Sequence, residues 1–363
     1  MWDLAALETF LDVPRVTQRE KISWKQLDIF GSKILTTLPT YCGRVPNLHF
    51  TEMVARFLLL PSPILSDDVG KTIYGCIRGI TRICDPFGDR LIGTSLRCRG
   101  WDDTHDAIRD FLYSMFQDAG ARSQKEPANI FISCVPDDQK EAFMENQHTI
   151  RPDLSASTYE NSYSLTTKEL IYDIKNIFSF DQWYSNNGRR SAVNMKESQT
   201  IKEYTTKARK LDDKFNPLAG KPGPIEQKLL SFGNVTPLVF GVFSEANKAV
   251  EALVDSLSKT KARRVAERYT RRSNFSNSVD IDTNALSARF KMTYMRVLST
   301  WVGYQKADLL IKRKCLIGLT PDQQRASLNS VNSRARPRGG FGQDFFGPEQ
   351  GTHFYGTNGA AHT

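Results

Sequence analysis

Hydrophobic and polar positions between residues 102 and 258 change their period several times, and each period predicts one kind of element. Residues 102–120 carry an apolar stripe at helical spacing, made of Ile108, Phe111, Leu112, Met115 and Ala119. Short apolar runs typical of strands follow at 129–135, 150–157 and 169–180. A helical stripe at 198–215, a continuous apolar strand at 236–243 and a helix at 244–258 complete the series. This order predicts an α/β fold with a mixed sheet flanked by helices.

The first of these helices carries recognisable end signals. Asp102, Asp103 or Thr104 is expected to cap its start, because short polar side chains accept hydrogen bonds from the free amides there. Gly120 is expected to end it, because glycine adopts the left-handed conformation without strain.

The same pattern, read over the whole chain, predicts five segments. They are a helical N-terminal region (1–65), an irregular cysteine-containing linker (66–101), the α/β core (102–260), basic C-terminal helices (261–319) and a tail (320–363). One long helical pattern covers 283–314. The tail is rich in Gly, Arg, Asn and Ser, a composition typical of disorder.

The distribution of positive charge bears on the binding partner of the chain. The 363-residue chain has 49 Lys and Arg against 40 Asp and Glu, a net charge of +9. The excess is clustered in 259–272, "KTKARRVAERYTRR", which suggests that Arg263, Arg264, Arg271 and Arg272 contact a nucleic-acid backbone. A solvated helix face is the alternative explanation. DNA, or RNA, is the partner that this charge favours.

We expect an intracellular protein, because the sequence shows no signal-peptide pattern and has few cysteines. The chain has no apolar run of 18 or more residues, so we expect no transmembrane helix and no membrane partner. Its N-terminus has early acids and no basic lead-in, unlike a signal peptide. Six cysteines are few for this length and are expected to be reduced thiols.

Candidate chemistry lies in two of the predicted strands. Asp153 follows Pro152, and Asp173 stands two places before Lys175 in an apolar run. Residues i and i+2 of a strand share a face, so Asp173 and Lys175 are expected to point together. Two carboxylates suit Mg²⁺, which a phosphodiesterase uses to activate water and neutralise the phosphate. The alternative is two ordinary strands with polar residues at their ends, although buried charges are costly unless they line a cleft.

Several stretches in order carry a resemblance to a known family. "RPD" followed by "YDIK" within helix–strand–strand–strand–helix–strand resembles the PD-(D/E)XK restriction-like nuclease fold. More specifically, residues from about 20 to 320 resemble the nuclease-containing C-terminal region of non-LTR retrotransposon polyproteins. The stretches involved include "FTEMVARFLLLPSP", "THDAIRDFLYSMFQDAGARSQKEP", "AVNMKESQTIKEYTTKARKLDDKFN" and "GPIEQKLLSFGNVTPLVFGVFSEAN".

The resemblance implies a metal-dependent DNA endonuclease that works with Mg²⁺ or Mn²⁺, in an intracellular and nuclear setting. Asp153 and Asp173 would be metal ligands together with the carbonyl of Ile174, and Lys175 would be the catalytic lysine. A further acid would come from the first helix or its neighbourhood: Glu126 is the candidate, with Asp106 or Asp110 as the fallback. Lys207 and Lys210, on the second helix, would assist at the phosphate, or would simply be solvated.

Two departures from the family leave other functions open. No Tyr/Phe-x-Asp-Asp polymerase motif lies in a strand context, so the chain would be a fragment, a cleaved product or a domesticated gene. The stretch "CDPFGDRLIGTSLRC" resembles a Cys/His knuckle of that family. The knuckle is incomplete, because Cys76, Cys84 and Cys98 are widely spaced and Arg90 stands where the family's motif would have a histidine. We therefore do not expect Zn²⁺. An inactive nuclease fold that binds nucleic acid is the first alternative, and a capsid- or scaffold-like protein is the second.

Overall fold

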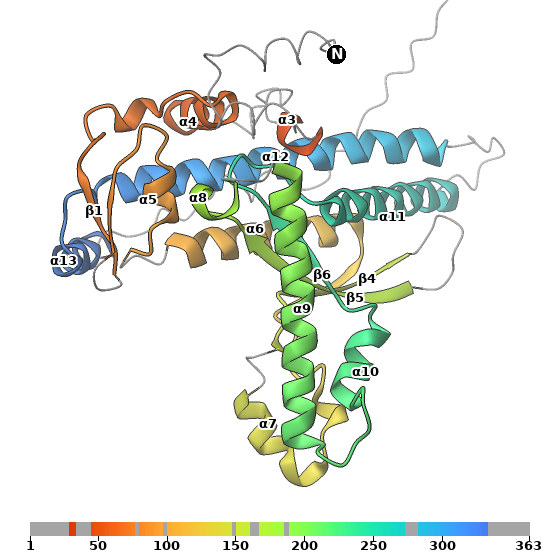
Figure 1. The fold of residues 1–363 in the computed structure, drawn as a ribbon. Helices are drawn as coiled ribbons and strands as arrows, with labels where there is room; N and C mark the ends of the chain where they lie inside the picture. Colours follow the sequence, from red (N-terminus) through yellow and green to blue (C-terminus); the bar gives the residue numbers. More distant parts are fainter. Residues whose placement is uncertain are drawn as a thin grey trace, which may run out of the picture.

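The computed structural model describes residues 29–33, 45–76, 80–96, 100–146, 150–159, 167–184, 189–272 and 282–332. Within them the chain forms a mixed α/β structure in which long helices cover both faces of a four-stranded sheet (Figure 1). The predicted fold class, a mixed sheet flanked by helices, is confirmed at this level. The described residues contain no helix long and apolar enough to cross a membrane.

The sheet contains the strands β3 (Arg122–Lys125), β4 (Leu154–Tyr159), β5 (Thr167–Asn176) and β6 (Val235–Phe240), in that order. β3 pairs with β4 and β4 with β5 in antiparallel fashion, with Leu154 opposite Tyr172. β5 and β6 run parallel, with Asp173 opposite Pro237. A parallel pair needs a crossover connection, and the helix α9 (Arg189–Phe215) lies in it.

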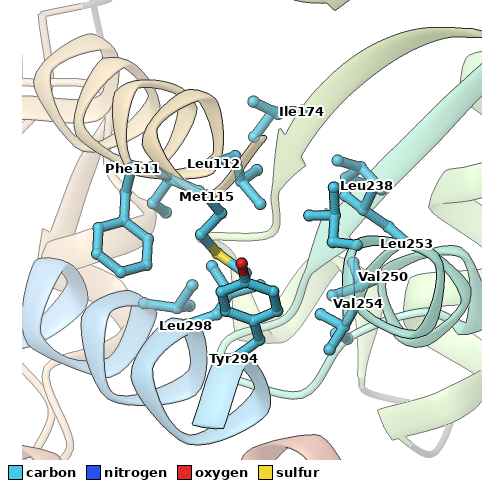
Figure 2. Packing of buried hydrophobic residues seen from close by; sticks show 14 of the residues in the cluster. Phe111, Leu112, Met115, Ile174, Leu238, Val250, Leu253, Val254, Tyr294 and Leu298 are labelled. Carbon is cyan, nitrogen blue, oxygen red and sulfur yellow. The ribbon is translucent and has the colours of Figure 1, made fainter. Parts of the chain in front are cut away.

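The two faces of β5 pack against different helices, as its alternating pattern predicts. Tyr172 and Ile174 belong to a core shared with α6 (Gly100–Ala119), α11 (Lys248–Arg272) and α12 (Thr283–Lys314). Figure 2 shows Ile174 and Leu238 on the sheet side of this core, while the helices contribute Leu253 of α11 and Leu298 of α12. Ile171 faces the other way, into a core with Tyr204 of α9. Asp173 and Lys175 therefore lie on the α9 side.

Helix α6 confirms its predicted stripe, since Ile108, Phe111, Leu112, Met115 and Ala119 are all buried. Gly120 follows the helix with φ 82°, as predicted for a C-terminal glycine. A Cβ there would also lie 2.7 Å from Cδ of Arg264. The predicted N-terminal cap is wrong, because the helix begins at Gly100 and places Asp102 and Asp103 in its first turn and Thr104 just after it.

The first strand of the sheet is not where hydrophobicity placed it. The apolar run 129–135 contains a short 3₁₀ turn, η3 (Ile132–Cys134), instead of a strand. Its Phe131 and Val135 are buried beside Phe143 and Ile150. The strand is β3, an edge strand of polar and mostly exposed residues. Edge strands are commonly charged because charge discourages pairing with other chains, and this removes the apolar signal.

The other predicted boundaries of the core shift by several residues. β5 ends at Asn176, and the expected strand residues up to 180 lead into α8 (Phe180–Trp183). α9 begins at Arg189 instead of 198, and α11 begins at Lys248 instead of 244. The boundary expected between 260 and 261 falls inside α11.

The short helices α7 (Lys140–Asn146) and α10 (Pro224–Ser231) extend the α9 side of the molecule. α10 packs against α9, and α7 follows the 3₁₀ turn η4 (Asp137–Gln139). Figure 1 shows the C-terminal half of α9 between α7 and α10, away from α11 and α12.

The region before the core is more regular than predicted. Its first part contains α3 (Ile29–Ser32), α4 (Asn47–Leu58) and η2 (Pro63–Leu65), with the rest of 1–44 outside the described residues. The segment expected to be irregular forms an antiparallel hairpin, β1 (Thr72–Tyr74) with β2 (Thr81–Ile83), and a short helix, α5 (Asp89–Gly93).

The long C-terminal helix packs on the core. α12 covers the predicted range 283–314, and it packs against α6, α11 and α4. The expected tail from residue 320 begins with a helix, α13 (Pro321–Asn332), so the prediction of disorder is wrong there. Residues 333–363 lie outside the described part of the chain.

Candidate active site

Asp153 lies directly before β4 and is fixed by its backbone. Its amide donates to the carbonyl of Tyr172 (3.0 Å), and its carbonyl accepts from the amide of Glu126 (2.8 Å). Its side chain, 15% exposed, then turns across the end of β4 to β5. There Oδ2 accepts from the amide of Ile174 (2.5 Å). The carboxylate thus replaces a main-chain partner at the point where the β4–β5 ladder ends.

Asp173 projects from β5 towards α9, as the strand alternation predicts. It is buried, with 3% of the residue exposed, and its Oδ1 accepts from the hydroxyl of Tyr204 (3.0 Å). The ammonium of Lys175 lies 2.6 Å from its Oδ2. The predicted pairing of Asp173 and Lys175 on one face is therefore present, and the amide of Ile174 between them ties Asp153 to the same segment.

The ionisable groups of this cluster influence one another. Burial would raise the pKa of Asp153, but the hydrogen bond and charge of His105, the amide of Ile174 and the charge of Lys175 together lower it. Burial raises the pKa of Asp173, and the charge of Asp153 adds to this effect, while Lys175 and Tyr204 oppose it. Burial would lower the pKa of Lys175, but the carboxylate of Asp173 outweighs burial and raises it. Lys175 is therefore an ammonium at neutral pH.

His105 and Tyr204 are the residues of this cluster to which the sequence assigned no part in the site. Nε2 of His105, on α6, lies 3.1 Å from Oδ2 of Asp153, and Nδ1 lies 3.3 Å from Oδ1 of Asp106. Burial would lower the pKa of His105, but its bonds to the two carboxylates raise it. The hydroxyl of Tyr204, on α9, lies 3.0 Å from the carbonyl of Arg151 as well as from Asp173. In the sequence, Tyr204 is one of the inward-facing positions of the helix predicted at 198–215.

Glu126, the expected third acid, is placed beside the site but is engaged elsewhere. Its carboxylate forms ion pairs with Arg109 and Arg151. The fallback acids also have basic partners: Asp106 is paired with Arg109, and Asp110 is paired with Arg109 and Lys125. Their side chains are about half exposed on α6, at 52% and 50%.

The lysines expected to meet nucleic acid are exposed on α9. Lys207 and Lys210 both face solvent. Nζ of Lys207 lies 5.7 Å from the ring centroid of Tyr204, whose hydroxyl reaches Asp173. This cation is therefore one side chain away from the carboxylate cluster.

The arginines of the basic run have a different setting. Arg263 donates to Glu267 (3.0 Å), and Arg264 donates to the carbonyl of Asp118 (3.4 Å). Arg271 and Arg272 lie at the C-terminal end of α11, and the structure describes only their backbone. Arg264 thus helps to hold α11 against the end of α6.

The incomplete knuckle forms part of the hairpin region. Cys76 Sγ lies 2.9 Å from Oγ of Ser95, and Cys84 is buried, which raises its pKa to about 11. Arg90 is exposed, and Cys98 lies outside the described residues. Across the described part of the chain, no group of three or more His, Cys, Asp and Glu residues is arranged as a metal-ligand set.

Comparison of the chain with protein-family models, with curated proteins and with solved structures found no match.

Proposed function

We propose that this protein is a metal-dependent DNA endonuclease of the PD-(D/E)XK restriction-like kind, as found in non-LTR retroelements or genes domesticated from them. One observation carries the proposal. Asp153, Asp173 and Lys175 are joined in one cluster, in which Nζ of Lys175 lies 2.6 Å from Asp173 and Asp153 binds the amide of the intervening Ile174.

The order of elements supports the same proposal. α6, the antiparallel strands β3, β4 and β5, then α9 and the parallel strand β6 follow the helix–strand–strand–strand–helix–strand order of that nuclease core. The cluster lies where β4 begins and β5 nears its end, between α6 and α9. A fold alone does not set a function, so the proposal depends on the cluster.

The oxygen donors of this cluster suit a hard divalent cation. Asp153 and Asp173 would hold Mg²⁺ or Mn²⁺ with the carbonyl of Ile174, because carboxylate and carbonyl oxygens are the ligands such ions prefer. The amide and carbonyl of one strand residue point to the same side, so the carbonyl of Ile174 faces the edge where its amide meets Asp153. When bound, the ion would neutralise the phosphate and activate a water molecule.

Lys175 would act in this proposal as a fixed positive charge. Its pKa is raised by Asp173, so it would stabilise negative charge developing on the phosphate and would not remove a proton from water. Lys207, next to the ring of Tyr204, would hold a neighbouring phosphate of the same strand.

Nicking of supercoiled plasmid with Mg²⁺ or Mn²⁺ tests the proposal. Asp153→Asn, Asp173→Asn and Lys175→Met should each abolish nicking, while circular dichroism shows a folded chain. Asp213→Asn and Lys202→Met, exposed positions on α9, are the matched controls and should nick normally. Full activity in any of the first three variants would overturn the proposal.

A second candidate is a nucleic-acid-binding protein on an inactive nuclease fold. It is favoured by the engagement of Glu126 with two arginines and by the nitrogen partners that the central carboxylates already have, His105 for Asp153 and Lys175 for Asp173. This candidate predicts salt-sensitive DNA or RNA binding that EDTA does not change, without nicking in either metal.

A further inference from the structure

The side chain of Asp153 is held by two donors on the same oxygen. Oδ2 lies 2.5 Å from the amide nitrogen of Ile174 and 3.1 Å from Nε2 of His105. The two donors come from different elements, Ile174 from β5 and His105 from α6. A carboxylate oxygen offers about two lone-pair sites, so two donors occupy Oδ2 and Oδ1 is the oxygen left to a ligand.

We propose that His105 is a positioning residue, which holds Oδ2 of Asp153 so that Oδ1 is presented to the divalent cation. The inference rests on the proposed function, because it concerns the cation of the same site. A carboxylate that can rotate about its terminal torsion presents either oxygen, whereas one clamped by two N–H donors presents a single oxygen in one direction.

The ring of His105 is itself oriented by its surroundings. Nδ1 lies 3.3 Å from Oδ1 of Asp106, and the same oxygen of Asp106 lies 3.1 Å from Nη1 of Arg109. Both ring nitrogens thus face carboxylates, which fixes the plane of the imidazole.

The helix that carries the ring is anchored in turn, since Nε1 of Trp301, on α12, donates to the carbonyl of Ala107 (3.1 Å). Together, the polar contacts form a continuous chain that runs from Arg109 on α6 through Asp106 and His105 to Asp153.

Mn²⁺ titration followed by electron paramagnetic resonance, without DNA, measures the effect directly. His105→Leu removes the donor, and we expect Mn²⁺ affinity to fall roughly 10- to 100-fold, the usual effect of losing a residue that orients a metal ligand. His105→Gln keeps an N–H donor at the end of the side chain and should stay within about threefold of the unmodified protein. His49→Leu is the matched control, because His49 also bonds an aspartate, Asp308, at 3.3 Å, but on α4.

The outcomes separate this inference from the proposed function. Wild-type affinity in His105→Leu, tighter binding in that variant, or equal losses in the Leu and Gln variants would each overturn the role of the His105 donor. An unmodified protein that binds no Mn²⁺, or an Asp153→Asn variant that binds it normally, would overturn the proposed function and the inference with it. Thermal melting of each variant distinguishes lost affinity from lost folding.

Discussion

The hydroxyl of Tyr204 donates a 3.0 Å hydrogen bond to the buried carboxylate of Asp173, so α9 is bonded to the centre of the sheet through the candidate site. The same hydroxyl lies 3.0 Å from the carbonyl of Arg151, two residues before Asp153. One side chain therefore contacts β5, which carries Asp173, and the segment leading into β4, which carries Asp153.

Tyr204→Phe should lower both stability and metal affinity. The change leaves Oδ1 of Asp173 buried without this donor, which costs about 1–3 kcal/mol of unfolding free energy. Urea denaturation measures that loss, and Mn²⁺ titration measures the second effect.

Tyr294→Phe provides the matched control for this prediction. Tyr294 also donates to an aspartate, Asp118, at 2.6 Å, but at the packing of α12 on α6. This variant should lose stability without losing Mn²⁺ affinity. An equal loss of metal affinity in both variants would contradict the assignment of Tyr204 to the site.

Glu126→Gln should leave nicking and Mn²⁺ affinity close to those of the unmodified protein. The carboxylate of Glu126 is engaged by Arg109 and Arg151 and is 39% exposed. Losing its charge should therefore lower the free energy of unfolding by roughly 1 kcal/mol or less. Asp153→Asn serves as the comparison, with loss of both activities expected. If Glu126→Gln instead behaves like Asp153→Asn, Glu126 is the third acid that the sequence resemblance implied.

Lys207 and Lys210 should contribute to DNA affinity through the phosphate backbone. Replacing both with Ala should weaken binding to all sequences and reduce the slope of log affinity against log salt by roughly 1 for each lysine. Arg263→Ala is the contrasting variant, because Arg263 already donates to Glu267, and its effect on the slope should be smaller. Fluorescence anisotropy over a salt series checks both, and equal slope changes would contradict the difference.

The parts of the fold that the sequence predicted are those with a periodic apolar face. The apolar stripe of α6 is buried in one core, and the alternating residues of β5 are buried in two cores, one on each face of the sheet. β3 escaped prediction because its backbone pairs with β4 while its side chains remain polar. The apolar run at 129–135 misled for the opposite reason: Phe131 and Val135 are buried from a turn.

In the candidate site, sequence spacing predicted the local contact but not the long-range ones. Asp173 and Lys175 are two residues apart on one strand, so local geometry alone brings them together. The contact of His105 with Asp153 joins residues 48 positions apart, and no local pattern encodes it. The ion pairs of Glu126 likewise depend on how β3 meets α6, which spacing along the chain does not specify.

Lys306, on α12, should make stability depend on pH in the alkaline range. Its side chain is buried, Nζ has no hydrogen-bond partner among the described residues, and burial lowers its pKa to about 7. The buried Glu245 raises that pKa and Arg56 lowers it further, so both charges face the amine. Because the pKa is lower in the folded state than in the unfolded state, the unfolded state holds the proton between about pH 7 and 10. Stability should therefore fall as the pH falls through this window, and the contribution should become constant below about pH 7.

Lys306→Met tests this by removing the titrating group while keeping an unbranched side chain of similar length. The unfolding free energy of the variant minus that of the unmodified protein should grow by about 1.4 kcal/mol for each pH unit lowered between 9.5 and 7.5. Lys312→Met, an exposed position on α12 with 61% of the side chain accessible, should show no such trend. Urea denaturation at several pH values measures all three proteins. Parallel stability curves for Lys306→Met and the unmodified protein would show that Lys306 keeps its proton when buried, with Glu245 as its counter-ion.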